Sequence, residues 1–293
     1  MISKFKQRDY LQRFMFDNTP IRGNTVHLNV TLNSALQYHD YPAPLRALLG
    51  ELMAASALLS ATLKMDGALV LQIQGKGALK LLVVECNAGL GMRATAKWDG
   101  ELPEKFKDMI GDGHCVITLA PKEGEPYQGI VPLEGENIAE MLEDYMLRSQ
   151  QIDTRLWLNF DGENAAGMLI QKLPNQPEQD ADAWNRICIL ADTVTNDELQ
   201  QLDLELLLTR LFGEEDVRMF SAKPTQFQCS CNRTSVANML HMLGKDEVDS
   251  ILAERSQIEV NCEFCNKRYE FDAVDAAALF TSEPVAPTTS AKH

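Results

Sequence analysis

Two pairs of cysteines stand close together near the C-terminal end of the sequence. One residue separates Cys229 from Cys231, two residues separate Cys262 from Cys265, and 30 residues lie between the pairs. Zinc in structural sites is tetrahedral and accepts soft thiolate ligands. Two tight pairs of thiols that a fold brings together supply four such ligands. The spacing therefore predicts one Zn²⁺ ion bound by these four cysteines.

Short elements must position these sulfurs. QIEVNCEFCNKRYEF at 257–271 predicts a hairpin with the second cysteine pair at its turn. Within the gap, SVANMLHMLG at 235–244 and DEVDSILAER at 246–255 predict two short helices. His241 falls in the first of these helices, beside a set of four sulfurs that is already complete. We therefore expect His241 to be solvated or partly packed, and not a ligand.

A four-sulfur zinc site has two possible roles. As a structural site, it would supply an apparent ~10–16 kcal/mol of folding free energy to a unit of about 55 residues that buries little apolar surface. As a switch, its zinc-bound sulfurs would be open to peroxide, because they have thiolate character. A disulfide within either pair would remove two ligands at once, and its small ring favours ready reduction. Spacing alone does not distinguish these roles.

Composition restricts the class of protein. The chain has 293 residues, of which 45% are hydrophobic and 24% charged, as in ordinary globular proteins. Its net charge of −15 disfavours binding to phosphate backbones. The first residues lack a signal-peptide core, and no stretch approaches the roughly 18 uninterrupted apolar residues of a membrane span. We therefore predict a cytoplasmic protein that binds neither nucleic acid nor membrane.

The remaining cysteines have no such arrangement. In a reducing cytosol, seven cysteines do not indicate a disulfide framework. Cys86 and Cys115 fall in strand-like runs, and Cys188 falls on the apolar side of a helix-like segment. We expect these three to be buried small hydrophobic residues.

Four regions follow from the pattern along the chain. Residues 1–175 alternate turn dipeptides with strand-like runs such as ALVLQIQ and RLWLNF, and contain helix candidates at 43–64 and 136–149. They predict an α+β core domain built on antiparallel sheets. Residues 176–225 predict a helical linker, 226–281 the zinc-binding redox domain, and 282–293 a disordered tail.

The linker is both acidic and amphipathic. Residues 175–225 contain eleven acidic and four basic residues, a net charge of −7. Thr195 and Glu198 have capping-box spacing, and the apolar run after them continues to Gly213. The apolar faces of these helices must be covered by a neighbouring domain. We assign four side chains to this covered face, either as permanent linker packing or as a hidden apolar surface: Trp184, Ile187, Leu202 and Leu206.

Several stretches resemble the bacterial 33 kDa chaperonin, or heat-shock protein 33, family of redox-regulated holdases. The resemblance is strongest in FQCSCNR at 227–233 and CEFCNKRYEFD at 262–272. It extends, in the same order as in the family, over RFMFDNTPIRGNTVHL, YMLRSQQIDTRLWL, GMLIQKLP and LTRLFGEEDVRMF.

The resemblance implies a fold and a mechanism. It implies an α+β core, a helical linker, and a C-terminal domain in which Cys229, Cys231, Cys262 and Cys265 bind zinc. It further implies disulfides Cys229–Cys231 and Cys262–Cys265 on oxidation, zinc release, linker unfolding, and conversion of an inactive monomer into a dimeric, ATP-independent holdase for unfolding proteins. No family function matches Cys86, Cys115 or Cys188, and a reaction of these thiols with oxidant would complicate the two-disulfide scheme.

Four other functions can be weighed from the residues, of which two stay open. A passive structural zinc protein and a thiol oxidoreductase acting through Cys262 and Cys265 both fit the cysteine spacing. An enzyme of another kind is disfavoured, because nucleotide-binding loops are missing from the sequence and four sulfur ligands leave no coordination position for water. A nucleic-acid-binding zinc module is disfavoured because residues 226–275 contain five basic and nine acidic residues.

Overall fold

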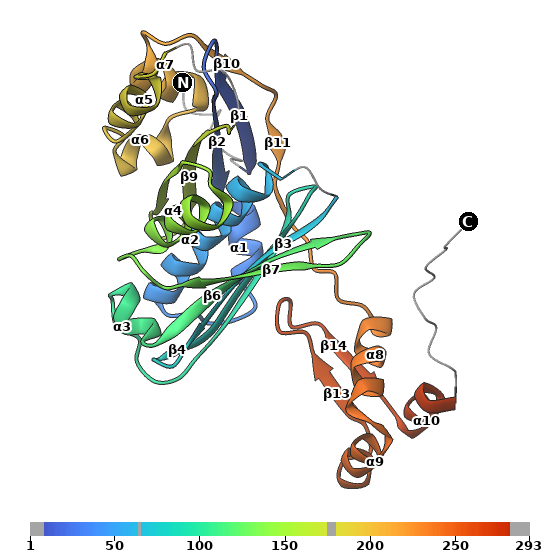
Figure 1. Cartoon of the computed structure of the whole chain (residues 1–293). Coiled ribbons are helices and arrows are strands. Elements are labelled where there is room, and N and C mark those ends of the chain that lie inside the picture. Colours follow the sequence, from blue (N-terminus) through green and yellow to red (C-terminus); the bar gives the residue numbers. More distant parts are fainter. Residues whose placement is uncertain (1–8, 64–65, 175–179, 282–293) are drawn as a thin grey trace, which may run out of the picture. The chain divides into compact units, whose positions relative to one another are not determined.

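The computed structural model describes residues 9–63, 66–174 and 180–281, which form two compact units (Figure 1). The first unit ends at Gln228 and the second begins at Cys229. Residues 180–225 of the predicted linker thus share one unit with the core. Residues 226–227, assigned above to the zinc domain, form strand β12 and pair with β5 of the first unit. The predicted tail at 282–293 lies outside the described residues.

A largely antiparallel pair of sheets forms the first unit, which confirms the predicted α+β class. The first sheet has the order β10-β1-β2-β9-β8, with β11 also paired to β1. The second has the order β12-β5-β4-β3-β6-β7, in which β12 alone runs parallel to its neighbour. The strands of the first sheet are β1 (Tyr10–Phe16), β2 (Ile21–Leu28), β8 (Thr154–Phe160), β9 (Ala165–Lys172), β10 (Val217–Met219) and β11 (Lys223–Pro224). Those of the second are β3 (Gly67–Gly75), β4 (Leu79–Asn87), β5 (Gly91–Trp98), β6 (Gly113–Pro121), β7 (Tyr127–Pro132) and β12 (Gln226–Phe227).

Helix α2 (Ala43–Ser60) fills the space between the two sheets. It packs on β2, β8 and β9 of the first sheet and on β3, β4 and β5 of the second. By length and composition α2 could cross a membrane, but most of it is buried inside this core. Three further helices complete the layer: α1 (Val30–Leu36), α3 (Phe106–Ile110) and α4 (Ile138–Gln150). As the sequence predicts, α4 turns Ile138, Met141, Leu142 and Tyr145 into the core.

The linker helices cover the outer face of the first sheet. Strand β9 is buried on both faces, because successive side chains alternate between two layers. Leu169 faces the α2 layer, whereas Met168 and Ile170 face a second apolar cluster that the linker completes. That cluster receives its helical side from α5 (Ala183–Ala191), α6 (Asn196–Gln201) and α7 (Leu204–Phe212). The core domain thus supplies the cover that the amphipathic sequence requires.

The single apolar run predicted after Thr195 is two helices. The capping box of Thr195 and Glu198 is present at the start of α6. Leu202 then adopts an extended conformation, and the Asp203 side chain caps α7 by accepting a hydrogen bond from the Leu206 amide. The first helix therefore ends before Leu202, and a second begins after Asp203, because the Asp203 carboxylate satisfies an amide that lacks a helical partner.

A carboxyl group lies beneath the linker, in a small cavity of about 270 Å³. Glu51 of α2 lines this cavity together with Trp157 of β8 and with Val194 and Leu199 of the linker. Burial raises the pKa of Glu51 from 4.5 to about 7. Between these values the folded state binds more protons than the unfolded state, so this group lowers stability progressively as pH rises from 4.5 to 7.

The Glu51→Gln variant tests this. Because the amide does not titrate, we expect the variant to gain about 2–3 kcal/mol of unfolding free energy over the native protein between about pH 5 and about pH 8. Urea unfolding at the two pH values measures the difference. Glu123→Gln, at an exposed position, is the charge-matched control and should follow the native profile. Parallel pH profiles for the native and Glu51→Gln proteins would contradict the assignment.

The second unit is a small domain with a hairpin and three helices. Strands β13 (Ile258–Asn261) and β14 (Arg268–Phe271) pair antiparallel, and helices α8 (Arg233–Leu243) and α9 (Lys245–Glu254) occupy the gap between the cysteine pairs, as predicted. Helix α10 (Ala273–Thr281) follows. The buried core of the second unit, over the described residues, has six side chains: Leu240, Val248, Ile258, Tyr269, Phe271 and Ala276.

Candidate metal centre

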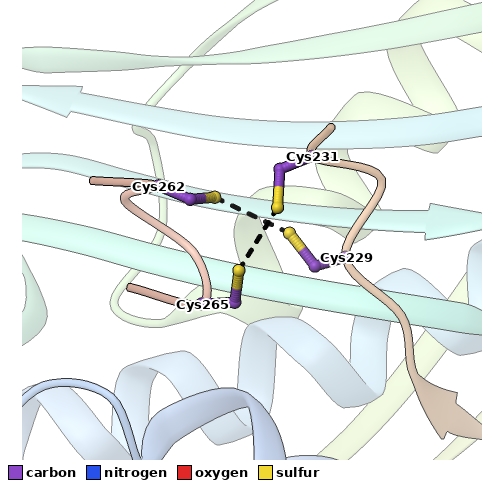
Figure 2. A group of neighbouring side chains, drawn as sticks. All are labelled: Cys229, Cys231, Cys262 and Cys265. Carbon is purple, nitrogen blue, oxygen red and sulfur yellow. Dashed lines mark hydrogen bonds between the residues drawn. The ribbon is translucent and has the colours of Figure 1, made fainter. Parts of the chain in front are cut away.

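The four predicted cysteines converge at one point of the second unit. Figure 2 shows their sulfur atoms directed toward one another. All four Sγ atoms lie within 4.8 Å of one another, and all four residues are half-buried. The Cys229 and Cys262 sulfurs are 3.7 Å apart, and those of Cys231 and Cys265 are 3.4 Å apart. Each of these two contacts joins one cysteine of the first pair to one of the second.

This arrangement fits one tetrahedral metal ion. Zinc–sulfur bonds of about 2.3 Å place the sulfurs of a tetrahedral site about 3.8 Å apart. The two measured distances lie close to this value, and the remaining separations stay within 4.8 Å. Four soft donors at this spacing suit a soft or borderline cation. The cluster could therefore bind a single metal ion.

Local backbone structure holds the second pair in position. The Cys262 amide donates to the Lys267 carbonyl at 3.0 Å, and the Asn266 amide donates to the Cys262 carbonyl at 2.8 Å. Asn266 closes this turn with a φ of 51°, a left-handed conformation that asparagine tolerates. On the other side, the Asn232 side chain caps α8 directly after Cys231 by accepting from the Ser235 amide. Both pairs thus sit where a regular element begins or ends.

A tyrosine that sequence reasoning missed contacts the cluster. The Tyr269 hydroxyl lies 3.2 Å from Cys231 Sγ. Burial and the neighbouring sulfurs raise the pKa of the Cys265 thiol, and the hydrogen bond with Cys231 raises the pKa of Tyr269. A phenol is protonated at neutral pH, so the Tyr269 hydroxyl is the donor in this contact. The alternation of side chains along β14 could have pointed to Tyr269, but its contact with Cys231 depends on long-range packing.

The other cysteines are buried, as predicted. Cys86 and Cys115 are fully buried in strands β4 and β6, and Cys188 is 8% exposed on α5. Burial raises the pKa of Cys86 and of Cys115 to about 12, and that of Cys188 to about 11. Because the thiolate is the reactive form, these three thiols are poor targets for oxidants at neutral pH.

Two more sequence predictions concern single side chains. His241 is half-buried and stacks on Phe280 with ring centroids 5.3 Å apart, and it does not belong to the sulfur cluster.

Trp184, Ile187 and Leu202 belong to the apolar cluster between the linker and the first sheet. The inclusion of Leu206 on a hidden surface was wrong, because this side chain is 55% exposed. It points away from the face of α7 that presents Leu204 and Leu207 to the sheet.

Comparison with known proteins reveals relatives over nearly the whole chain. A family model described as Hsp33 protein matches residues 9–272. The chain is 60% identical to a 33 kDa chaperonin of Methylobacillus flagellatus, over 97% of this chain and 99% of the relative. It is 48% identical to a 33 kDa chaperonin of Chromobacterium violaceum, over 97% and 98% respectively.

A solved structure shares the fold. It is the crystal structure of a 33 kDa chaperonin, a heat shock protein 33 homolog, from Thermotoga maritima. The TM-score is 0.81 at 22% sequence identity, and the match covers 94% of this chain and 98% of that one.

Proposed function

The chain belongs to the Hsp33 family of chaperones, and from this premise we propose that it is a redox-regulated holdase that binds unfolding proteins without ATP and catalyses no reaction. The proposal assigns one Zn²⁺ ion to Cys229, Cys231, Cys262 and Cys265 in the reduced, inactive state. The observation that carries it is the convergence of four half-buried sulfurs within 4.8 Å. Bound zinc would keep these sulfurs ionised and would hold the small unit folded.

The oxidation step balances within each pair. One thiolate displaces hydroxide from a peroxide and becomes a sulfenic acid, and the second thiolate then displaces hydroxide from that sulfur to form the disulfide. In sum, two thiolates, one hydrogen peroxide and two protons give one disulfide and two waters. We assign the pairs Cys229–Cys231 and Cys262–Cys265 to this chemistry. Each disulfide removes two donors from the metal.

Loss of the metal would then destabilise the linker through the segment that connects α7 to Cys229. The segment that connects α7 to Cys229 is held to the first unit by three short strands, β10, β11 and β12. Short strands with few backbone hydrogen bonds belong to the least stable parts of a fold. Unfolding of the second unit would therefore spread into β12, β11 and β10, and would free the helices that carry Trp184, Ile187 and Leu202.

The released surface would bind client proteins. Detachment of α5, α6 and α7 exposes their apolar faces together with the sheet side chains beneath them. The net charge of −7 over 175–225 would limit self-aggregation of such a surface. We propose that the reduced protein is a monomer, that the oxidised protein is a dimer, and that it works in the cytoplasm.

One experiment tests the proposal. Peroxide is added at elevated temperature while zinc release and the light scattering of a denaturing client protein are recorded together. We expect zinc release to be followed by suppression of scattering without nucleotide, and to be reversed by a dithiol reductant. Mass spectrometry should find two disulfides, with Cys86 and Cys115, which stay buried in the first unit, still reduced. Zinc release without client protection would leave a passive metal site.

A further inference from the structure

Tyr269 is held rigidly against the sulfur cluster. Its side chain is 6% exposed and belongs to the core of the second unit. Its strand partner is Val260, two residues before Cys262. The Lys267 ammonium lies 5.4 Å from the centroid of the ring. The ring therefore has little freedom to turn its hydroxyl away from Cys231.

Two of the four sulfurs receive hydrogen bonds from β14 and the turn before it. The Tyr269 hydroxyl donates to Cys231 Sγ at 3.2 Å, and the Lys267 backbone amide donates to the Cys265 sulfur. Hydrogen bonds to a metal-bound sulfur withdraw electron density from it and tune its reactivity. The backbone amide at position 267 would be present with any side chain there except proline. The hydroxyl donor exists only because residue 269 is a tyrosine.

We propose that Tyr269 is a positioning residue that slows oxidation of the metal centre by donating its hydroxyl hydrogen bond to Cys231. This inference rests on the proposed function, because it concerns the rate at which peroxide oxidises the cysteines. The hydrogen bond removes electron density from the sulfur lone pairs that attack the peroxide oxygen. Tyr269 thus helps to set the oxidant concentration at which the switch opens.

The expected size of the effect follows from two general relations. A hydrogen bond to a charged group shifts an equilibrium by about ten- to a hundredfold. The nucleophilicity of sulfur follows its basicity with a coefficient of about one half. Loss of the hydroxyl should therefore accelerate attack by Cys231 about threefold to tenfold.

The test compares Tyr269→Phe with the native full-length protein in the reduced, zinc-loaded form. Peroxide-driven zinc release is followed with a chromophoric chelator, and we expect it to be about threefold to tenfold faster in the variant. In a second measurement, Co²⁺ replaces zinc and the sulfur-to-cobalt charge-transfer band is recorded. Loss of a hydrogen bond to sulfur should shift this band to lower energy, a change that a purely structural role would not produce.

Phe271→Leu is the matched control. Phe271 lies two residues further along β14, is 2% exposed in the same core, and carries no hydroxyl that could donate to a sulfur. This variant should lower the stability of the unit and leave the cobalt band unshifted. The inference would be overturned if zinc release accelerated in both variants only in proportion to their lost stability, and if the cobalt band of Tyr269→Phe did not shift. Failure of the native protein to release zinc would instead refute the proposed function, while the cobalt band would still test the hydrogen bond.

Discussion

The double substitution Cys262→Ser and Cys265→Ser is expected to unfold the second unit and leave the first unit folded. Four thiolate ligands would supply an apparent ~10–16 kcal/mol of folding free energy, and two remaining sulfurs cannot complete a tetrahedral site. The six buried side chains of the second unit form too small a core to replace that contribution. The first unit has its own two-sheet core and shares none of these side chains.

Hydrogen exchange with peptide resolution measures both halves of this expectation. Amides of α8, α9 and the β13–β14 hairpin should lose protection in the double variant, whereas those of α2 and β3 should keep it. Zinc analysis should find about one ion per native chain and none in the variant. His241→Ala is the control, and it should retain the metal because His241 stacks on Phe280 outside the sulfur cluster. Full protection of the hairpin in the double variant would show that the metal is not its main support.

The local features of the sulfur cluster could be predicted from sequence because they depend on neighbouring residues. Two cysteines at a hairpin turn and two before a helix determine a four-sulfur site by spacing alone. The contact of Tyr269 with Cys231 could not be predicted in this way, since it depends on how β14 packs across a core against residues 38 positions earlier. Pairing of β12 with β5, far away in the sequence, is a similar case.

In the linker, the apolar periodicity of the sequence predicts some features of the structure and not others. Amphipathic spacing correctly predicted helices with one apolar face, and Thr195 correctly predicted a start. It did not predict the break at Leu202, because Asp203 can cap a new helix only once the chain turns there. Nor did it predict the polar contacts that hold the linker to β8. Asp192 accepts hydrogen bonds from Arg155 at 2.8 Å and from Trp157 at 3.2 Å.

Two adjacent leucines of α7 test whether release of the linker controls activity. Leu207 is fully buried against the first sheet, whereas Leu206 is 55% exposed. Leu207→Ala should weaken the packing between linker and sheet by about 2–5 kcal/mol, through lost apolar contact and a cavity. Leu206→Ala makes the same chemical change on the same helix and should cost almost nothing, because the side chain already contacts water.

The proposed coupling between the linker and the four cysteines gives this pair of variants a functional readout. If detachment of α5, α6 and α7 creates the client-binding surface, the energy that oxidation must supply falls by the packing energy lost in Leu207→Ala. We therefore expect this variant to protect a denaturing client at lower peroxide, or without peroxide, while its zinc stays bound. Leu206→Ala should need the same peroxide as the native protein. Equal peroxide thresholds for Leu207→Ala and the native protein, despite lost protection of the linker amides in hydrogen exchange, would place the client-binding surface elsewhere on the molecule.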